Sequence, residues 1–99
     1  MYIISGEFKA KAECRDALIE MSLKLIPLSK KEPGCISYSF LEDQARPGHF
    51  VFFERWKTRD DITKHFEKSY FADFSASFPD MIDGTATIEI HEVASTENV

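Results

Sequence analysis

The sequence predicts an α+β fold of the ferredoxin-like, split βαβ type, in which a four-stranded antiparallel sheet carries its helices on one face. The main observation is the order of hydrophobic periodicities, which reads β-α-β-β-α-β between residues 2 and 93. The 99 residues are enough for one domain, which would bury about 65% of its unfolded surface. The 43% of hydrophobic and 29% of charged residues are typical of a globular domain. We therefore expect one domain over residues 1–94 and a loose tail over residues 95–99.

The chain begins with a predicted strand followed by a predicted helix. Tyr2–Ala10 is rich in β-branched and aromatic residues, which favour a strand. From Ala12 apolar residues recur at spacings of four and three, which predicts an amphipathic helix. Pro27 falls late in this helix and should kink or end it, because proline removes one backbone donor. The apolar stripe consists of Cys14, Leu18, Met21, Leu25 and Leu28.

A predicted hairpin follows the turn made by Glu32-Pro33-Gly34. In Cys35–Glu42, apolar and polar residues alternate, as expected for a strand with one buried face. Asp43–Gly48 is a polar loop, and His49–Trp56 is the next strand. Because the two strands are joined by a short loop, we expect them to pair with each other.

A second helical region is predicted after Thr58, whose side chain is a typical N-cap. Its buried face should carry Ile62, His65, Phe66 and Ser69. The helical pattern continues as far as Pro79, through Tyr70, Phe71, Phe74 and Phe78.

The last predicted strand is Thr85–Val93, which we expect to begin after a turn at Asp83-Gly84. With helices on one face only, the other face of the sheet would be bare. Val51 and Phe53 are expected on that face, and they are too apolar to be left in water. The sequence therefore predicts that the chain forms a homodimer through this sheet face.

Charge and cysteine usage indicate the class of partner and the compartment. The net charge of −5 argues against a nucleic-acid partner and against a membrane-surface partner. Cys14 and Cys35 lie at opposite ends of a helix of about 22 Å, too far apart for a disulfide. Met1–Ser5 lacks a signal-peptide pattern, and the longest apolar runs, such as Phe50–Phe53, are too short to span a membrane. We expect a cytoplasmic protein with reduced thiols.

Motifs for metals and cofactors are missing from the sequence. The three histidines, His49, His65 and His91, are far apart and have no second ligand at the usual spacing. The four glycines stand alone, so no phosphate-binding loop is recognisable. We therefore expect an activity that needs neither a metal nor a cofactor.

Three polar or aromatic residues remain as candidates for chemistry. His65 lies on the apolar face of its helix, where a hydrogen-bonded core histidine is the simpler interpretation. Trp56 ends a strand, where packing is the more common role. Glu54 shares the face of Trp56, and a carboxylate near a core needs a partner that the sequence does not identify. Exposure at the strand end is the alternative for Glu54.

The sequence also resembles a known family. Glu32-Pro33-Gly34-Cys35-Ile36-Ser37-Tyr38, then Phe52-Phe53-Glu54-Arg55-Trp56, then His65 with Tyr70-Phe71, resembles the antibiotic biosynthesis monooxygenase (ABM) domain family over most of the chain. The resemblance implies a dimeric α+β barrel, with a pocket between the helices and the sheet of each protomer. It implies a cofactor-independent monooxygenase that oxidises a small aromatic phenol, quinol or anthrone with O₂.

The resemblance also suggests roles for two residues. Trp56 would line the pocket and orient the substrate, and His65 would be an acid, a base or a hydrogen-bond donor. These two are the catalytic candidates. Helical and strand periodicity suggests the aromatic residues of the pocket wall, which would bind the substrate: Tyr38, Phe52, Phe66, Tyr70, Phe71 and Phe74.

Differences from other branches of the family leave alternatives open. Heme-degrading members carry an Asn in the first strand and a heme-binding His in the following helix, but this chain has Ser5 and Gly6 in that strand and no His over residues 71–78. Tyr70 stands about where other branches have a second His. An isomerase or detoxifying enzyme for a small metabolite, and a dimeric ligand-binding module without catalysis, are the two other interpretations.

Overall fold

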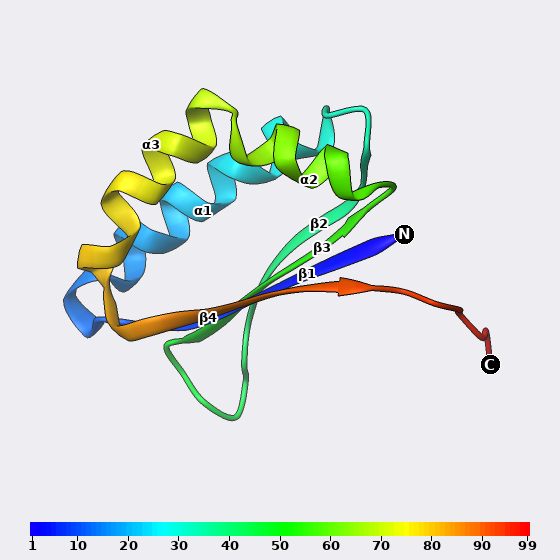
Figure 1. The fold of residues 1–99 in the computed structure, drawn as a ribbon. Helices are drawn as coiled ribbons and strands as arrows, with labels where there is room; N and C mark the ends of the chain where they lie inside the picture. Colours follow the sequence, from blue (N-terminus) through cyan, green and yellow to red (C-terminus); the bar gives the residue numbers. More distant parts are fainter.

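A four-stranded antiparallel sheet with the order β2-β3-β1-β4 carries all the helices on one face (Figure 1). This is the arrangement in a computed structural model that describes residues 1–99. The predicted ferredoxin-like α+β fold is confirmed. The elements are β1 (Tyr2–Ala10), η1 (Ala12–Cys14), α1 (Arg15–Lys30), β2 (Cys35–Glu42), β3 (His49–Trp56), α2 (Arg59–Phe66), α3 (Ser69–Ser77), η2 (Phe78–Met81) and β4 (Ile82–Glu92).

The first helix starts later than predicted and continues past Pro27. A 3₁₀ turn, η1, precedes it, so the α-helix itself starts at Arg15 and not at Ala12. Pro27 does not end the helix, which continues to Lys30. One missing donor near the end of a helix is tolerated here because the following backbone closes the last turn: Lys31 N–H donates to the carbonyl of Leu28.

The second helical region consists of two helices, where one continuous pattern was predicted. α2 ends at Phe66, and α3 begins at Ser69 after a short break. The predicted N-cap is confirmed, because Thr58 Oγ1 accepts from the backbone N–H of Asp61 at 3.1 Å. The Asp61 carboxylate accepts in return from Thr58 N–H at 3.1 Å, which completes a capping box.

The last strand starts earlier than predicted. β4 begins at Ile82, and Asp83 and Gly84 lie within it and not in a turn before it. The pairing of β1 with β4 shifts register between Glu7 and Lys9, and Gly84 has a φ of 71° near that irregularity. The glycine therefore accommodates a bulge in the strand, where the sequence suggested a turn.

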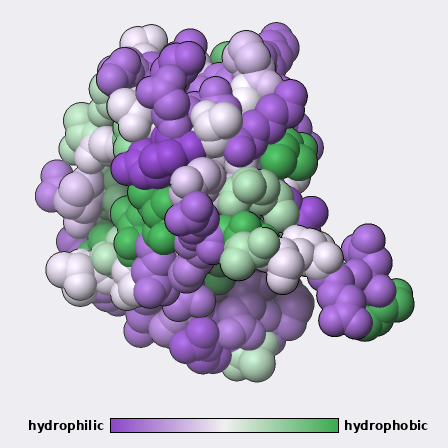
Figure 2. Space-filling model, turned by 45° about the vertical axis from the view of Figure 1, so that its right-hand side comes forward, coloured by the Kyte–Doolittle hydropathy of each residue, from purple (hydrophilic) through white to green (hydrophobic).

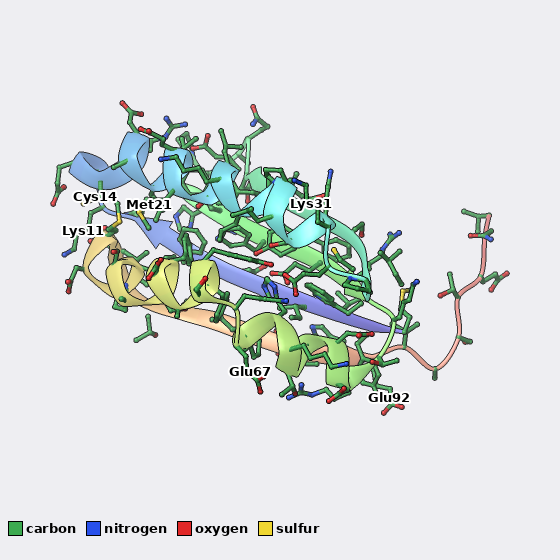
Figure 3. The ribbon with its side chains drawn as sticks, turned by 90° about the horizontal axis from the view of Figure 1, so that it is seen from above. Lys11, Cys14, Met21, Lys31, Glu67 and Glu92 are labelled. Atoms are coloured by element: carbon green, nitrogen blue, oxygen red, sulfur yellow. The ribbon has the colours of Figure 1, made fainter.

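The core lies between the helices and the sheet. Leu18 and Leu25 of α1 and Ile62 of α2 pack onto the inward face of the sheet, where Phe50 and Trp56 are also buried. Seen from above, α1 runs along one side of this layer, and α2 and α3 run along the other (Figure 3). Cys14 and Cys35 are free, as predicted.

The opposite face of the sheet is not covered by any element of the chain (Figure 1). Val51 and Phe53 are half-buried there, and Leu41, which pairs with Val51, is 53% exposed. Residues 93–99 form no helix or strand, and Figures 1 and 2 show the C-terminal end projecting from the body. None of the helices is both long enough and apolar enough to cross a membrane.

The turn after α1 packs closely against the start of α2, and a substitution at Gly34 tests the importance of this contact for stability. A Cβ on Gly34 would collide with the side chain of Asp61, which forms the capping box with Thr58. We expect Gly34→Ala to lower the free energy of unfolding by roughly 1–3 kcal/mol in a urea titration. Gly6→Ala is the control, because the nearest atoms to its Cβ would lie at 3.8 Å. Equal stability of the two variants would contradict this account of the turn.

Candidate active site

An apolar cavity of about 110 Å³ lies between the sheet and the helices. Its floor is formed by β1, β2, β3 and β4, and its roof by α1, α2, α3 and η2. Gly6 leaves space in the floor, because its missing side chain would lie 3.8 Å from both Phe52 and Ile88. The lining residues are Ile4, Gly6, Phe8, Leu25, Tyr38, Phe52, Glu54, Phe66, Phe71, Phe74, Ser75, Phe78, Ala86 and Ile88.

The cavity reaches solvent beside the edge strand β4. Ile88 lines the cavity and is 61% exposed, and Phe66 on the opposite rim is 37% exposed. Figure 2 shows such apolar patches within a mostly hydrophilic surface. Ser75 is the one polar lining residue that is exposed, so the open side of the cavity is largely apolar, which suits an aromatic ligand.

Most of the aromatic residues predicted for the pocket wall do line the cavity. They are Tyr38, Phe52, Phe66, Phe71 and Phe74. Tyr70 does not, because it faces the groove between α1 and α3, and its hydroxyl donates to Glu32. Trp56 and His65 are fully buried and are not among the residues that line the cavity.

Glu54 is the one carboxylate in the cavity wall. It is only 5% exposed, so the alternative of a surface position is wrong. Its partner is Trp56, whose Nε1–H donates to Glu54 Oε1 at 3.0 Å. Burial raises the pKa of Glu54 to about 7, the charge of Glu32 adds to this effect, and the hydrogen bond from Trp56 opposes it. Near neutral pH Glu54 is therefore present both as an acid and as a base.

His65 lies behind Glu54, between two buried carboxyl groups. Its Nδ1 is 2.7 Å from Glu32 Oε2, and the Tyr70 hydroxyl donates to the same oxygen. Because the Tyr70 hydroxyl donates to this oxygen, the oxygen acts as an acceptor, and we place the histidine proton on Nδ1. His65 Nε2 then has no proton and no hydrogen-bond partner, and it lies 3.9 Å from Glu54 Oε1.

The electrostatics keep His65 and Tyr38 neutral. Burial lowers the pKa of His65, although the hydrogen bond to Glu32 opposes the shift. Burial raises the pKa of Tyr38 far above its ordinary value, and the charge of Glu54 adds to this. The Tyr38 phenol in the cavity wall therefore keeps its proton, and Glu54 is the group there that titrates near neutral pH.

Sequence reasoning missed the role of Glu32. The residue belongs to the Glu-Pro-Gly turn after α1, where its N–H donates to the carbonyl of Ser29. Its carbonyl accepts from Cys35 N–H at 3.0 Å, which fixes the turn with the carboxylate pointing inward. Glu32 is only 8% exposed. From the sequence, a glutamate in a turn is expected to be a surface residue. Its contact with His65 is not visible in the sequence either, because 33 positions separate the two residues.

Comparison with known proteins places this site within a family. The sequence profile of the antibiotic biosynthesis monooxygenase family matches residues 1–77. The chain belongs to the antibiotic biosynthesis monooxygenase family.

Two relatives have similar sequences. An uncharacterised protein of Synechocystis, sll1783, is 37% identical over 97 residues, which cover 98% of this chain and 66% of that protein. The chain thus spans about two thirds of the length of this relative. YcnE of Bacillus subtilis, named as a candidate monooxygenase, is 26% identical over 83% of this chain and 86% of its own length.

Solved structures show that the ABM fold extends over the whole chain. A candidate antibiotic biosynthesis monooxygenase from Deinococcus radiodurans superposes with a TM-score of 0.93 at 23% identity, covering 100% of this chain and 98% of that one. Rv0793 from Mycobacterium tuberculosis has a TM-score of 0.92 at 20% identity, with 98% of each chain covered. At these identities the likeness shows the fold.

The raised pKa of Glu54 in this ABM chain has a consequence for stability. Folding raises the pKa from its ordinary value of 4.5 to about 7, so the folded state binds more protons than the unfolded state over this range. Stability is then lost as the pH rises from about 4.5 to about 7. Glu54→Gln removes this loss.

We expect the stability of the wild-type protein, relative to Glu54→Gln, to fall by roughly 2–3 kcal/mol between pH 4.5 and pH 8. Urea titrations at a series of pH values measure it. Glu67→Gln is the matched control, because Glu67 is exposed and points away from the body at the break between α2 and α3 (Figure 3). A difference that does not change with pH would mean that Glu54 titrates at its ordinary pKa.

Proposed function

We propose that the protein is a cofactor-independent monooxygenase that oxidises a small aromatic phenol, quinol or anthrone with O₂. The supporting observation is Glu54, a titratable carboxyl group in the wall of an otherwise apolar cavity. Aromatic side chains such as Phe52 and Phe71 suit the ring of the substrate, and Glu54 suits its hydroxyl group. The ABM family of the chain agrees with this reaction class.

Glu54 is the general base of the proposed reaction. Its carboxylate takes the proton of the phenol hydroxyl, and the resulting phenolate is electron-rich enough to reduce O₂. The phenolate transfers electrons to O₂, and a C–O bond forms at a ring carbon to give a hydroperoxide anion. No separate redox group is needed, because the substrate supplies the electrons.

The same carboxyl group then serves as the acid. Protonated Glu54 returns its proton to the outer oxygen of the hydroperoxide anion. The O–O bond breaks as the ring C–H proton is lost, so that water leaves and a quinone remains. For a phenol the sum is one phenol and one O₂ consumed, and one quinone and one water formed.

Trp56 and His65 are positioning residues in this proposal, since neither lines the cavity. Trp56 holds Glu54 through its indole N–H and opposes the rise in its pKa. His65 presents an unprotonated Nε2 at 3.9 Å from Glu54, and its ring is fixed from behind by Glu32. The pair therefore sets where the carboxyl group lies and when it is charged.

The first experiment is oxygen uptake by the purified protein with a panel of hydroquinones, naphthols and anthrones. Autoxidation without protein is the background to subtract. We expect uptake above this background, and a loss of roughly 10²-fold or more in kcat for Glu54→Gln. Glu67→Gln should remain active. Product formed without O₂ would replace the proposal with an isomerase, and ligand binding without turnover would replace it with a binding module.

Trp56→Phe tests whether Trp56 acts through Glu54. The variant lacks the N–H that lowers the pKa of Glu54, so this pKa should rise above about 7. We expect the pH profile of kcat/KM to shift towards higher pH, with the fold retained. If the pH at which kcat/KM reaches half of its maximum is the same in the variant and the wild type, Trp56 does not act through the pKa of Glu54. His65→Ala should also lose activity while keeping the fold.

The uncovered sheet face is part of the same proposal, as the surface on which two copies form a dimeric α+β barrel. Phe53 pairs with Ser5 in the neighbouring strand, and Leu41 pairs with Val51, so these side chains share the uncovered face. Burying such a face removes apolar surface from water and favours association.

We expect the wild-type protein to elute with twice the chain mass in size-exclusion chromatography with light scattering. Leu41→Asp combined with Phe53→Glu should give the monomer, because charges on this face would be buried without partners. Lys24→Glu on the outer side of α1 is the control, since Lys24 is exposed on the other side of the molecule. A wild-type monomer at micromolar concentration would contradict the proposed dimer.

A further inference from the structure

The cavity that holds Glu54 is no larger than a site for a single aromatic ring. Its volume is about 110 Å³. An apolar cavity of about 150 Å³ is known to hold one benzene molecule, whereas sites for drug-sized ligands measure about 300–1,000 Å³. A ligand with two or three fused rings therefore needs more space than the cavity provides.

A second space lies directly outside the cavity, between α1 and α3. This groove has a volume of about 350 Å³. Met21 and Leu28 of α1 form one wall, and Tyr70 of α3 lies on the other. Viewed from above, α1 and α3 run side by side, and Met21 points from α1 towards α3 (Figure 3). Cavity and groove together reach the size range of sites for larger ligands.

Only two side chains border both spaces, Leu25 of α1 and Phe74 of α3. Leu25 is part of the core and only 4% exposed. Phe74 is half-buried in a helix that has no fully buried residue. Its ring packs edge-on against Phe52 at 5.7 Å and stacks on Phe78 at 5.2 Å. These contacts hold the Phe74 ring as the partition between cavity and groove.

We propose that Phe74 favours ligands with a single aromatic ring, because it closes the route from the Glu54 cavity into the groove between α1 and α3. The ligand class is then a monocyclic phenol or hydroquinone whose hydroxyl group faces Glu54. This inference rests on the proposed function for the identity of the ligand, and it narrows the phenols, quinols and anthrones to those with one ring.

Removing the partition should reverse the preference for size. In Phe74→Ala the two spaces join, so a second ring can enter the groove while the hydroxyl group stays at Glu54. The joined space gains the apolar side chains of Met21 and Leu28, although polar residues also border the groove: Lys24, Asp73 and Ser77. Each ring added to a phenol exposes more apolar surface in water, so a longer ligand gains affinity wherever it fits.

The test is the binding of phenol and 2-naphthol, which differ by one ring, in the absence of oxygen. Titrations followed by ¹H–¹⁵N NMR give the dissociation constants, and the amides of Gly6 and Ala86 report whether the ligand lies in the cavity. We expect the wild-type protein to bind phenol at least as tightly as 2-naphthol. In Phe74→Ala the ratio should shift towards 2-naphthol by about tenfold, or about 1.4 kcal/mol.

A second variant shows whether the gain depends on the groove. Ser77 lines the groove but not the cavity, so Ser77→Trp should fill the groove and leave the cavity unchanged. In the double variant Phe74→Ala, Ser77→Trp, the shift towards 2-naphthol should disappear. Phe74→Leu, which removes the ring but keeps an apolar side chain, replaces Phe74→Ala if that variant fails to fold.

Two results would overturn the inference: wild-type protein that binds 2-naphthol more tightly than phenol in the cavity, or a gain for 2-naphthol that persists when the groove is filled. Because binding is measured without oxygen, the outcome is independent of turnover. Absence of oxygen uptake with every compound would overturn the oxygenase proposal and leave the ring-size result standing.

Discussion

The structure of the site depends on one buried carboxyl group, that of Glu54. This group lies in an apolar wall, where burial of a charge is costly, and it has one hydrogen bond, from Trp56. A second buried carboxyl group, Glu32, lies nearby and has two donors on one oxygen. The charge of Glu32 raises the pKa of Glu54 further. Two glutamates with unequal hydrogen bonding give one fixed charge and one group that exchanges its proton near neutral pH.

The two sides of the cavity are built with different rigidity. The floor is a sheet of four paired strands, and Glu54 is fixed in β3 between β1 and β2. The roof comes largely from α3 and η2, neither of which has a fully buried residue. The carboxyl chemistry therefore lies on the rigid side, and the aromatic residues that shape the ligand space lie on the side that is less firmly anchored.

The sequence was informative about elements and less so about contacts between them. Strand alternation in β3 and the Thr58 cap follow from local rules, and these features are confirmed. In β2 the alternation fails at Ile36, which is 48% exposed, because the pairing with β3 shifts register between Cys35 and Ser37. The bulge at Gly84 and the break between α2 and α3 depend on tertiary packing, which periodicity does not report. Periodicity also placed most of the aromatic cavity wall. It could not identify Glu32, because the link to His65 joins a turn and a helix that meet only in the folded chain.

Gly6 affects the space for a ligand without affecting the pairing of the strand in which it lies. The position lies in a paired strand at the floor of the cavity, and its missing side chain leaves space that neither Phe52 nor Ile88 fills. Larger side chains there would occupy the ligand's place while the strand kept its pairing with β3 and β4. The side chain at this single position of β1 therefore decides how much of the cavity is left for a ligand, while the strand pairing is set by the backbone.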